Sequence, residues 1–228
     1  MSSRASGAGP RAVLWDVDGT LIDSSEYHWL AWREALAAEG APITREQFAA
    51  MFGRRNDEIL RAHFGGDYPP AEVARVGYAK EELYRSLVRA RGIKLLPGVR
   101  DWLERLRAGG WLQAMASSAP RANLEAITGA LGLEGYFDAV VSAEDVTVGK
   151  PDPQVFLTAA ARLGVEPARC VVVEDAPAGI EAARRARMRS VGVLTMHRHL
   201  QADLVVPTLA HLPADAFDSL LARANDLG

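Results

Sequence analysis

The sequence contains little cysteine and no long apolar run, and each shortage excludes a class of protein. Its one cysteine, Cys170, cannot support an intramolecular disulfide framework, and this is typical of a reducing compartment. No stretch is long and apolar enough to cross a bilayer. Residues 1–10 lack the apolar centre of a signal peptide and are predicted to form a flexible N-terminal tail. We therefore expect a cytoplasmic protein with no membrane partner.

An excess of positive charge is also absent. The chain has 26 Lys and Arg against 29 Asp and Glu, for a formal net charge of -3, and it shows no basic stripe. This balance argues against nucleic acid as a partner. With 228 residues, 49% of them hydrophobic, the chain can bury one good core, or a core and a smaller lobe. We expect a monomer that binds a small molecule.

The most informative segment lies near the N-terminus, where a short apolar run precedes two aspartates. Residues 13–15 are long enough only for a buried strand, and Asp16 and Asp18 follow it into a Gly19-Thr20 turn. Alternate residues of a strand face the same way, so both carboxylates can point into one site. Two carboxylates that close repel each other unless a cation separates them, which favours Mg2+. The alternative is a strand that simply ends in a polar turn.

The next part of the sequence has helical periodicity and no strand. Two of its helices are predicted from a capping pair, a short polar residue followed three positions later by Glu or Gln: Asp23 with Glu26, and Thr44 with Gln47. Further helices are expected at residues 56–64 and from Pro69-Pro70 to the stop at Gly92. Four helices without an intervening strand predict a separate helical lobe, a cap domain over residues 23–96.

From residue 97 onward, helices alternate with short apolar strands. The strands are predicted at residues 112–116, 139–141, 171–173, 190–193 and 204–206. This alternation is typical of a parallel sheet with helices on both faces. The predicted fold is therefore α/β: a Rossmann-like, doubly wound parallel sheet core over residues 11–22 and 97–228, with the helical cap inserted after the first strand. In such sheets, ligands bind at the carboxyl ends of the strands.

Polar residues stand at three further places in this part of the sequence. Ser117 and Ser118 come directly after one strand, where they either cap the next helix or hold a phosphate. Lys150 lies between two rigid segments, although a solvated side chain is the usual state of a single lysine. Glu174 and Asp175 follow the most β-branched run. An acidic pair at the end of a buried strand is costly unless a metal or a base receives it.

With these residues the sequence resembles the haloacid dehalogenase superfamily of phosphotransferases over nearly its whole length. The matches to the four motifs of that superfamily stand in the family's order: Asp16-Val17-Asp18-Gly19-Thr20, Ser117, Lys150 and Glu174-Asp175. The helical insertion between the first and second motifs is similar to the family's mobile cap. The resemblance implies an enzyme, a phosphoric monoester hydrolase.

The resemblance also implies a mechanism. Asp16 is the nucleophile that attacks phosphorus and becomes an aspartyl phosphate. Asp18 protonates the leaving alcohol and then takes a proton from the attacking water. Lys150 and the Ser117 hydroxyl offset the charge of the phosphoryl oxygens. The family's dehalogenases lack an aspartate at the position of Asp18, so this residue favours phosphoryl transfer.

The expected cofactor is Mg2+. The resemblance implies that it is held by the side chain of Asp16, the backbone carbonyl of Asp18 and the carboxylate of Asp175, with Glu174 as a further ligand.

Substrate choice is expected to depend on the cap. Within the superfamily, residues 26–29 with Trp32 resemble the branch of β-phosphoglucomutases and sugar-phosphate phosphatases. His28 matches a mutase histidine that is linked to cap closure and to the acid-base aspartate, and Lys80 matches a mutase lysine near the sugar; both are candidate substrate contacts. The alternatives are a structural histidine and a lysine on a solvated helix face.

The loop of residues 52–58 separates two activities. Where the mutases carry an arginine that grips the substrate's second phosphate, this sequence has Asn56, although Arg54 or Arg55 could substitute. We therefore expect a phosphatase of sugar or polyol phosphates, with Ser118 also near the substrate. The alternatives are a β-phosphoglucomutase and, from another class of protein, a non-catalytic sugar-phosphate sensor.

Overall fold

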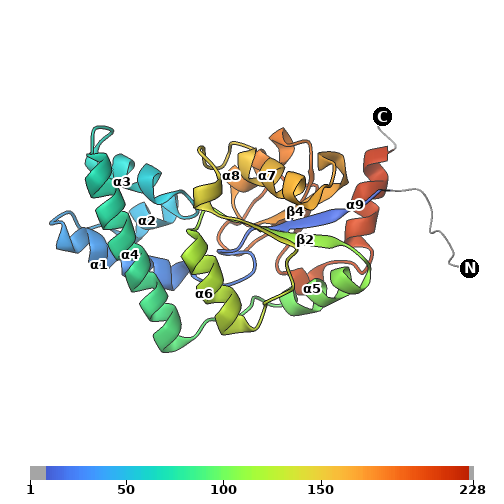
Figure 1. Ribbon diagram of the computed structural model, residues 1–228, viewed down its shortest axis with the longest axis horizontal. Helices are drawn as coiled ribbons and strands as arrows, with labels where there is room; N and C mark the ends of the chain where they lie inside the picture. Colours follow the sequence, from blue (N-terminus) through green and yellow to red (C-terminus); the bar gives the residue numbers. More distant parts are fainter. Residues whose placement is uncertain (1–8, 226–228) are drawn as a thin grey trace, which may run out of the picture.

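The computed structural model describes residues 9–225, so most of the predicted N-terminal tail lies outside the described residues. Its centre is one parallel sheet with the strand order β3-β2-β1-β4-β5-β6 (Figure 1). The strands are β1 (Ala12–Trp15), β2 (Leu112–Ala116), β3 (Ala139–Val141), β4 (Cys170–Glu174), β5 (Arg189–Val193) and β6 (Leu204–Val206). The expected α/β fold is confirmed, and β1 lies between β2 and β4.

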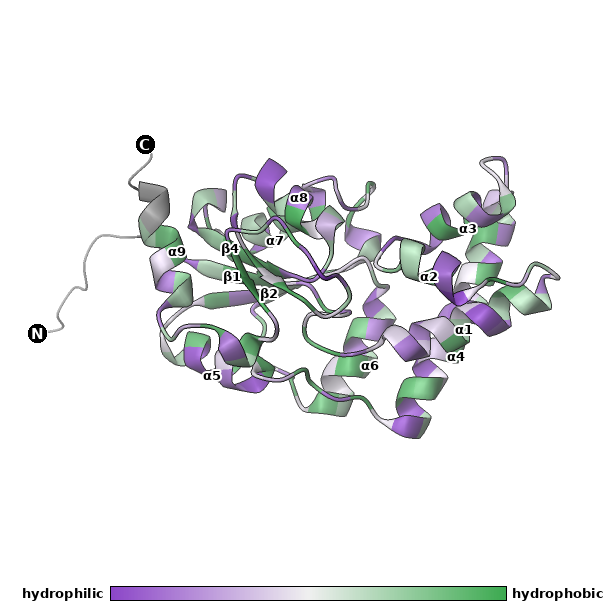
Figure 2. Cartoon of the chain, turned by 180° about the vertical axis from the view of Figure 1, so that it is seen from behind, coloured by the Kyte–Doolittle hydropathy of each residue, from purple (hydrophilic) through white to green (hydrophobic). Residues whose placement is uncertain are grey.

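Helices cover both faces of the sheet because each strand alternates its apolar side chains between them. Val13 and Trp15 of β1 join one buried cluster, which includes side chains of α5 (Val99–Ala108), α6 (Arg121–Leu131) and α9 (Ala216–Asn225). Ala12 and Leu14 join a second cluster, with α7 (Gln154–Leu163) and α8 (Pro177–Arg185). Figure 2 shows apolar residues concentrated in the strands between these helices. Three short 3-10 helices complete the core: η1 (Ala143–Asp145), η2 (Pro167–Arg169) and η3 (Leu209–His211).

The four remaining helices form a lobe beside one end of the sheet (Figure 1). They are α1 (Ser25–Ala38), α2 (Arg45–Met51), α3 (Asn56–Phe64) and α4 (Pro70–Arg91). The lobe has its own apolar cluster, centred on Trp29, Trp32, Leu36, Phe48 and Leu60. We call these four helices the helical lobe. Among the described residues, no helix has the length and apolarity that crossing a membrane requires.

The two connections between the helical lobe and the core run side by side. Leu96 donates a backbone hydrogen bond of 2.9 Å to the carbonyl of Leu21. Ile22 forms an isolated antiparallel bridge with Leu95, and a parallel one with Asp18. The turn after β1, which carries Asp18, is therefore joined directly to both connections.

One local prediction failed, one is confirmed, and one helix was not predicted. Asp23 does not cap α1: the N-cap is Ser24, which makes no side-chain capping bond and whose hydroxyl donates to Asp18. The capping box of Thr44 and Gln47 on α2 is confirmed, with bonds of 3.2 and 2.8 Å. Helix α9 was not predicted, although Phe217 and Leu220 have helical spacing and are buried against the sheet.

Candidate active site

The register of the sheet brings the polar residues of three strands to one edge. Trp15, the last residue of β1, pairs with Met115 of β2 and with Val173 of β4. The alignment of the strands extends one residue beyond these pairs, since the backbone N–H of Asp16 donates to the carbonyl of Val173 at 3.0 Å. Asp16, Ser117 and the Glu174-Asp175 pair therefore meet at the carboxyl ends of β1, β2 and β4.

Three buried carboxylates cluster at this edge. Asp16, Glu174 and Asp175 each offer an oxygen, and these oxygens lie within 4.8 Å of one another. Burial raises the pKa of Asp16, and the nearby charge of Glu174 raises it further, although Lys150 opposes both effects. Burial and the charge of Glu174 likewise raise the pKa of Asp175. The three carboxylates repel one another when they are ionised, and a bound cation would reduce this repulsion.

The surroundings of Asp175 fit a bound cation. Its Oδ2 atom is buried and has no hydrogen-bond partner in the part of the chain that the structure describes. Gly19, with φ +87°, passes so close that a Cβ atom there would lie 2.0 Å from this oxygen. A buried carboxylate oxygen without a donor is costly, and a hard divalent cation bound by oxygen ligands would satisfy it. The acidic cluster therefore fits a metal ion.

Lys150 is the cation that the structure places beside these carboxylates. Its Nζ atom lies 2.6 Å from Oδ1 of Asp16 and 2.8 Å from Oε1 of Glu174, and its side chain is 5% exposed. Burial alone would lower the pKa of Lys150, but the attraction of both carboxylates outweighs burial and raises it. Glu174 uses its other oxygen to accept the backbone N–H of Ala176 at 2.6 Å. The solvated lysine considered from the sequence is thus excluded.

The serine pair after β2 does not cap a helix. Helix α6 begins four residues after Ser117, at Arg121, and its N-cap is Pro120. The Ser117 hydroxyl oxygen accepts the backbone N–H of Ala119 at 3.0 Å, and this bond leaves the hydroxyl hydrogen free to donate. Ser117 and Ser118 both line the cavity described below.

Asp18 faces the helical lobe rather than the acidic cluster. Its Oδ1 atom accepts the Ser24 hydroxyl and lies 3.1 Å from Nε2 of His28. Burial opposes ionisation of Asp18, but its hydrogen bonds with His28 and Ser24 help to keep its pKa below the usual value. Its side chain is not part of the cluster of Asp16, Glu174 and Asp175.

The lobe residues predicted to bind substrate belong to a buried polar chain. Lys80 is 2% exposed, so it does not lie on a solvated helix face, and its Nζ atom lies 2.9 Å from Nδ1 of His28 and 2.8 Å from Oε1 of Glu81. The same Nζ atom is 5.2 Å from the ring centre of Trp32. His28 stacks on Tyr84, with ring centroids 4.1 Å apart. His28 is therefore a hydrogen-bonded, packed histidine that also lines the cavity.

The three candidates at the start of α3, which are Arg54, Arg55 and the first helical residue Asn56, have separate positions. Arg54 is exposed and lines the cavity. Arg55 does not line it: its Nη1 atom donates to the carbonyls of Ala143 and Val146 in the core, at 3.0 and 2.9 Å. Asn56 lines the cavity and donates to Glu81 at 2.8 Å.

A cavity of about 270 Å³ lies where the helical lobe faces the strand ends. All of the predicted site residues except Arg55 line it: Asp16, Asp18, His28, Trp32, Arg54, Asn56, Lys80, Ser117, Ser118, Lys150, Glu174 and Asp175. His197, in the loop after β5, also lines it and was not predicted. The rule that ligands bind at the carboxyl ends of parallel strands could have indicated this loop.

Comparison with known proteins agrees with this arrangement. Residues 10–187 match the family model of haloacid dehalogenase-like hydrolases. A β-phosphoglucomutase of Bacillus subtilis is 37% identical over 202 residues, which cover 86% of this chain and 88% of that protein. A fructose-1-phosphate phosphatase of Escherichia coli is 37% identical over 186 residues, which cover 79% and 95%.

A solved structure is similar over almost the full length. The β-phosphoglucomutase of Clostridium difficile superimposes with a TM-score of 0.85 at 27% identity, covering 96% of this chain and all of that one. The match of the family model starts two residues before β1 and ends two residues after α8, and so it includes every predicted site residue. The chain belongs to the haloacid dehalogenase-like hydrolase family, and the expected class of enzyme, a hydrolase of this superfamily, is confirmed.

Proposed function

We propose that this chain is a monomeric, cytoplasmic, Mg2+-dependent phosphatase of sugar or polyol phosphates that acts through an aspartyl phosphate on Asp16. One observation carries the proposal: Asp16, Lys150, Glu174 and Asp175 lie together at the base of a cavity that the helical lobe covers. Residues 23–96 would then act as the cap that closes over the substrate and excludes water.

The acidic cluster would hold the cofactor. Asp16 and Asp175 provide carboxylate oxygens, the backbone carbonyl of Asp18 a third ligand, and Glu174 is close enough to contribute. When bound, Mg2+ supplies positive charge that offsets the negative oxygens of the phosphoryl group. The unpartnered Oδ2 atom of Asp175 supports this assignment.

The first chemical step would form a bond between a carboxylate oxygen of Asp16 and phosphorus while the ester P–O bond breaks. The negative charge of the bound phosphoryl group would raise the pKa of Asp18, which in its protonated form gives its proton to the departing alcohol oxygen. In the second step, a water molecule attacks phosphorus, loses a proton to Asp18 and releases inorganic phosphate and free Asp16. Lys150 and the hydroxyl of Ser117 donate hydrogen bonds to the phosphoryl oxygens in both steps. Lys150 also favours the ionised form of Asp16 and orients it through their 2.6 Å contact.

The size of the cavity and the relatives support a small substrate. A volume of about 270 Å³ is near the lower end of ligand sites, which span roughly 300–1,000 Å³. Two similar proteins of Escherichia coli are a fructose-1-phosphate phosphatase and a hexitol phosphatase, at 37% and 33% identity. A sugar or polyol monophosphate fits both facts.

The loop before α3 favours hydrolysis over mutase action. A mutase must hold a second phosphate on the cap, ideally with a bidentate arginine. Asn56 offers a neutral amide that already donates to Glu81, and Arg55 is bonded to core carbonyls. The alternative, a β-phosphoglucomutase, is supported by Arg54, which lines the cavity, and by the Bacillus subtilis relative.

Two assays test the proposal. Hydrolysis of p-nitrophenyl phosphate with and without Mg2+ separates an enzyme from a non-catalytic sensor, and a panel of phosphorylated sugars and polyols then identifies the substrate. β-Glucose 1-phosphate with a trace of bisphosphate separates the two enzymes. We expect inorganic phosphate and no sustained formation of glucose 6-phosphate. Fast glucose 6-phosphate formation with little free phosphate would overturn the phosphatase assignment, and absence of any turnover with Mg2+ would overturn both enzymes.

A further inference from the structure

The polar chain of the helical lobe does not end at Lys80, because Glu81 continues it into the core. Glu81 lies on α4 and is 3% exposed. Its Oε1 atom accepts hydrogen bonds from Lys80 and from Asn56, both at 2.8 Å. Its Oε2 atom accepts one from Nδ2 of Asn123 at 2.6 Å. One buried carboxylate thus joins two helices of the lobe to a residue of core helix α6.

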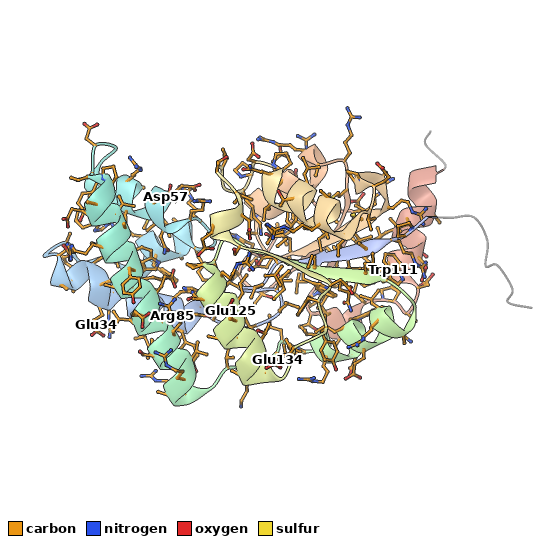
Figure 3. The ribbon with its side chains drawn as sticks, in the orientation of Figure 1. Glu34, Asp57, Arg85, Trp111, Glu125 and Glu134 are labelled. Atoms are coloured by element: carbon orange, nitrogen blue, oxygen red, sulfur yellow. The ribbon has the colours of Figure 1, made fainter. Side chains whose placement is uncertain are left out.

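Asn123 is held in one orientation. It is completely buried, and its Oδ1 atom accepts Nη1 of Arg85 at 2.8 Å. An arginine can only donate and an ionised glutamate can only accept, so the amide of Asn123 cannot be turned over between them. Helices α4 and α6 run beside each other, and Arg85 projects from α4 on the side of α6 (Figure 1, Figure 3). This contact is a fixed bridge between lobe and core.

The other end of the chain reaches Asp18 with a defined direction. The ammonium group of Lys80 can only donate hydrogen bonds, so Nδ1 of His28 must be the acceptor in their 2.9 Å contact. The hydrogen of His28 then lies on Nε2, which donates to Oδ1 of Asp18. Among the hydrogen bonds of the described residues, none ends on Oδ2 of Asp18. The chain therefore fixes one oxygen of Asp18 and leaves the other for proton transfer.

We infer that Glu81 and Asn123 are positioning residues for Asp18. Glu81 fixes Lys80, which fixes the tautomer and orientation of His28, and Asn123 ties this arrangement to the seating of the lobe on α6. The inference rests on the proposed function, because it gives Asp18 the role of the acid. It extends that function to residues that do not touch the reacting atoms, and it makes correct orientation of the acid depend on a contact between lobe and core.

Leaving-group dependence distinguishes this role from a merely structural one. A sugar alcohol needs a proton to leave, whereas p-nitrophenolate does not, and kcat/KM reports the steps up to alcohol release. In Glu81→Gln, kcat/KM for the preferred sugar or polyol phosphate should fall about tenfold more than kcat/KM for p-nitrophenyl phosphate, since general acid catalysis contributes about 10²–10⁴-fold. Asn123→Ala should also lower the ratio of kcat/KM for the sugar or polyol phosphate to kcat/KM for p-nitrophenyl phosphate, by a smaller factor.

Glu72→Gln is the matched control, since it makes the same change at a partly exposed glutamate of α4 that pairs with Arg75. The ratio of the two kcat/KM values in Glu72→Gln should equal that of the wild type. An equal loss on both substrates, or no loss, in Glu81→Gln would overturn the inference. If that variant does not fold, the result for Asn123→Ala decides alone by the same criterion. A wild-type protein without turnover on either substrate would instead overturn the proposed function, so the two failures are distinguishable.

Discussion

The Nζ atom of Lys150 lies 2.6 Å from Oδ1 of Asp16, although the two residues are 134 positions apart in the chain. A charge-assisted hydrogen bond of this length fixes the carboxylate that the proposed mechanism uses as its nucleophile. The same lysine bonds to Glu174, whose second oxygen is held by the backbone of Ala176. The nucleophile is thus oriented by a chain of contacts that ends on the rigid start of α8.

Replacement of Lys150 by methionine, which keeps the length but removes the charge, should lower turnover by at least about a hundredfold, because a donor to the phosphoryl oxygens is lost. The kinetic assay is steady-state hydrolysis of the preferred substrate. Lys94→Met changes an exposed lysine and should leave turnover unchanged. A Lys150→Met enzyme with turnover close to that of the wild type would exclude the lysine from the reaction.

Asp16→Asn should abolish hydrolysis while the protein stays folded. The amide can still accept the bond from Lys150, but it cannot attack phosphorus, and losing a nucleophile costs on the order of a thousandfold or more. Circular dichroism and thermal unfolding verify the fold, and single-turnover assays measure the loss. A variant that retains about a tenth of wild-type turnover would contradict the assignment of the nucleophile.

Asp175→Ala should raise the Mg2+ concentration needed for half-maximal activity, because one charged oxygen ligand is lost. A second readout does not depend on catalysis: Mg2+ should raise the melting temperature of the wild type by mass action, and this shift should shrink in the variant. Asp67→Ala, at an exposed loop position, serves as the control. Identical Mg2+ titrations for Asp175→Ala and the wild type would show that the acidic pair binds no metal.

Arg54 and Arg55 should respond differently to alanine substitution. Arg54 lines the cavity, so Arg54→Ala should raise KM for a sugar phosphate about tenfold, which corresponds to the loss of one charged hydrogen bond. Arg55 bonds to the carbonyls of Ala143 and Val146, so Arg55→Ala should lower kcat for every substrate by loosening the lobe on the core. The opposite pattern would place Arg55, and not Arg54, next to the substrate.

Asp145 should stabilise the fold in a pH-dependent way. The hydrogen bond from Arg162 lowers its pKa most, burial opposes this, and Ser142 and Arg121 lower it further. Because the folded pKa is below the unfolded value of about 3.9, the ionised form stabilises the protein at neutral pH, and this stabilisation is lost as the pH falls through the folded pKa. Asp145→Asn should cost on the order of 1 kcal/mol at neutral pH.

Urea unfolding of both proteins at several pH values checks this expectation. The difference in unfolding free energy between wild type and Asp145→Asn should be constant above about pH 5 and should decrease below about pH 4. Other carboxylates titrate in both proteins, so their effects cancel in the difference. A difference that grows as the pH falls would contradict the lowered pKa.

Much of the fold could be predicted from local patterns. The bounds of α3 (Asn56–Phe64) and β2 (Leu112–Ala116) agree with the predicted ranges, because apolar periodicity and turn residues determine them within the segment itself. The N-cap of α1 was predicted wrongly because it is Ser24 and no side chain caps this helix, so the capping pattern of Asp23 and Glu26 did not mark its start.

The predicted site residues came from chemistry at strand ends, and the sheet register brings them together. Contacts between the lobe and the core could not be predicted in this way. Nothing near Arg55 in the sequence indicates the carbonyl of Val146, and nothing near Glu81 indicates Asn123, because such pairs depend on how two separately packed units meet. The loop alignment could not decide among the three candidates either, whereas the side-chain directions separate Arg54 from Arg55.

The paired connections of the helical lobe have a consequence for how such a protein can change. The lobe leaves the core at Leu21 and returns at Leu96, and these residues are joined by a 2.9 Å backbone hydrogen bond. An inserted segment whose two ends lie close together disturbs the host fold little, in the same way that a long surface loop costs little closure entropy. The lobe can therefore be exchanged as a module, so that new specificities arise by recombination while the sheet and its reactive carboxylates are inherited unaltered.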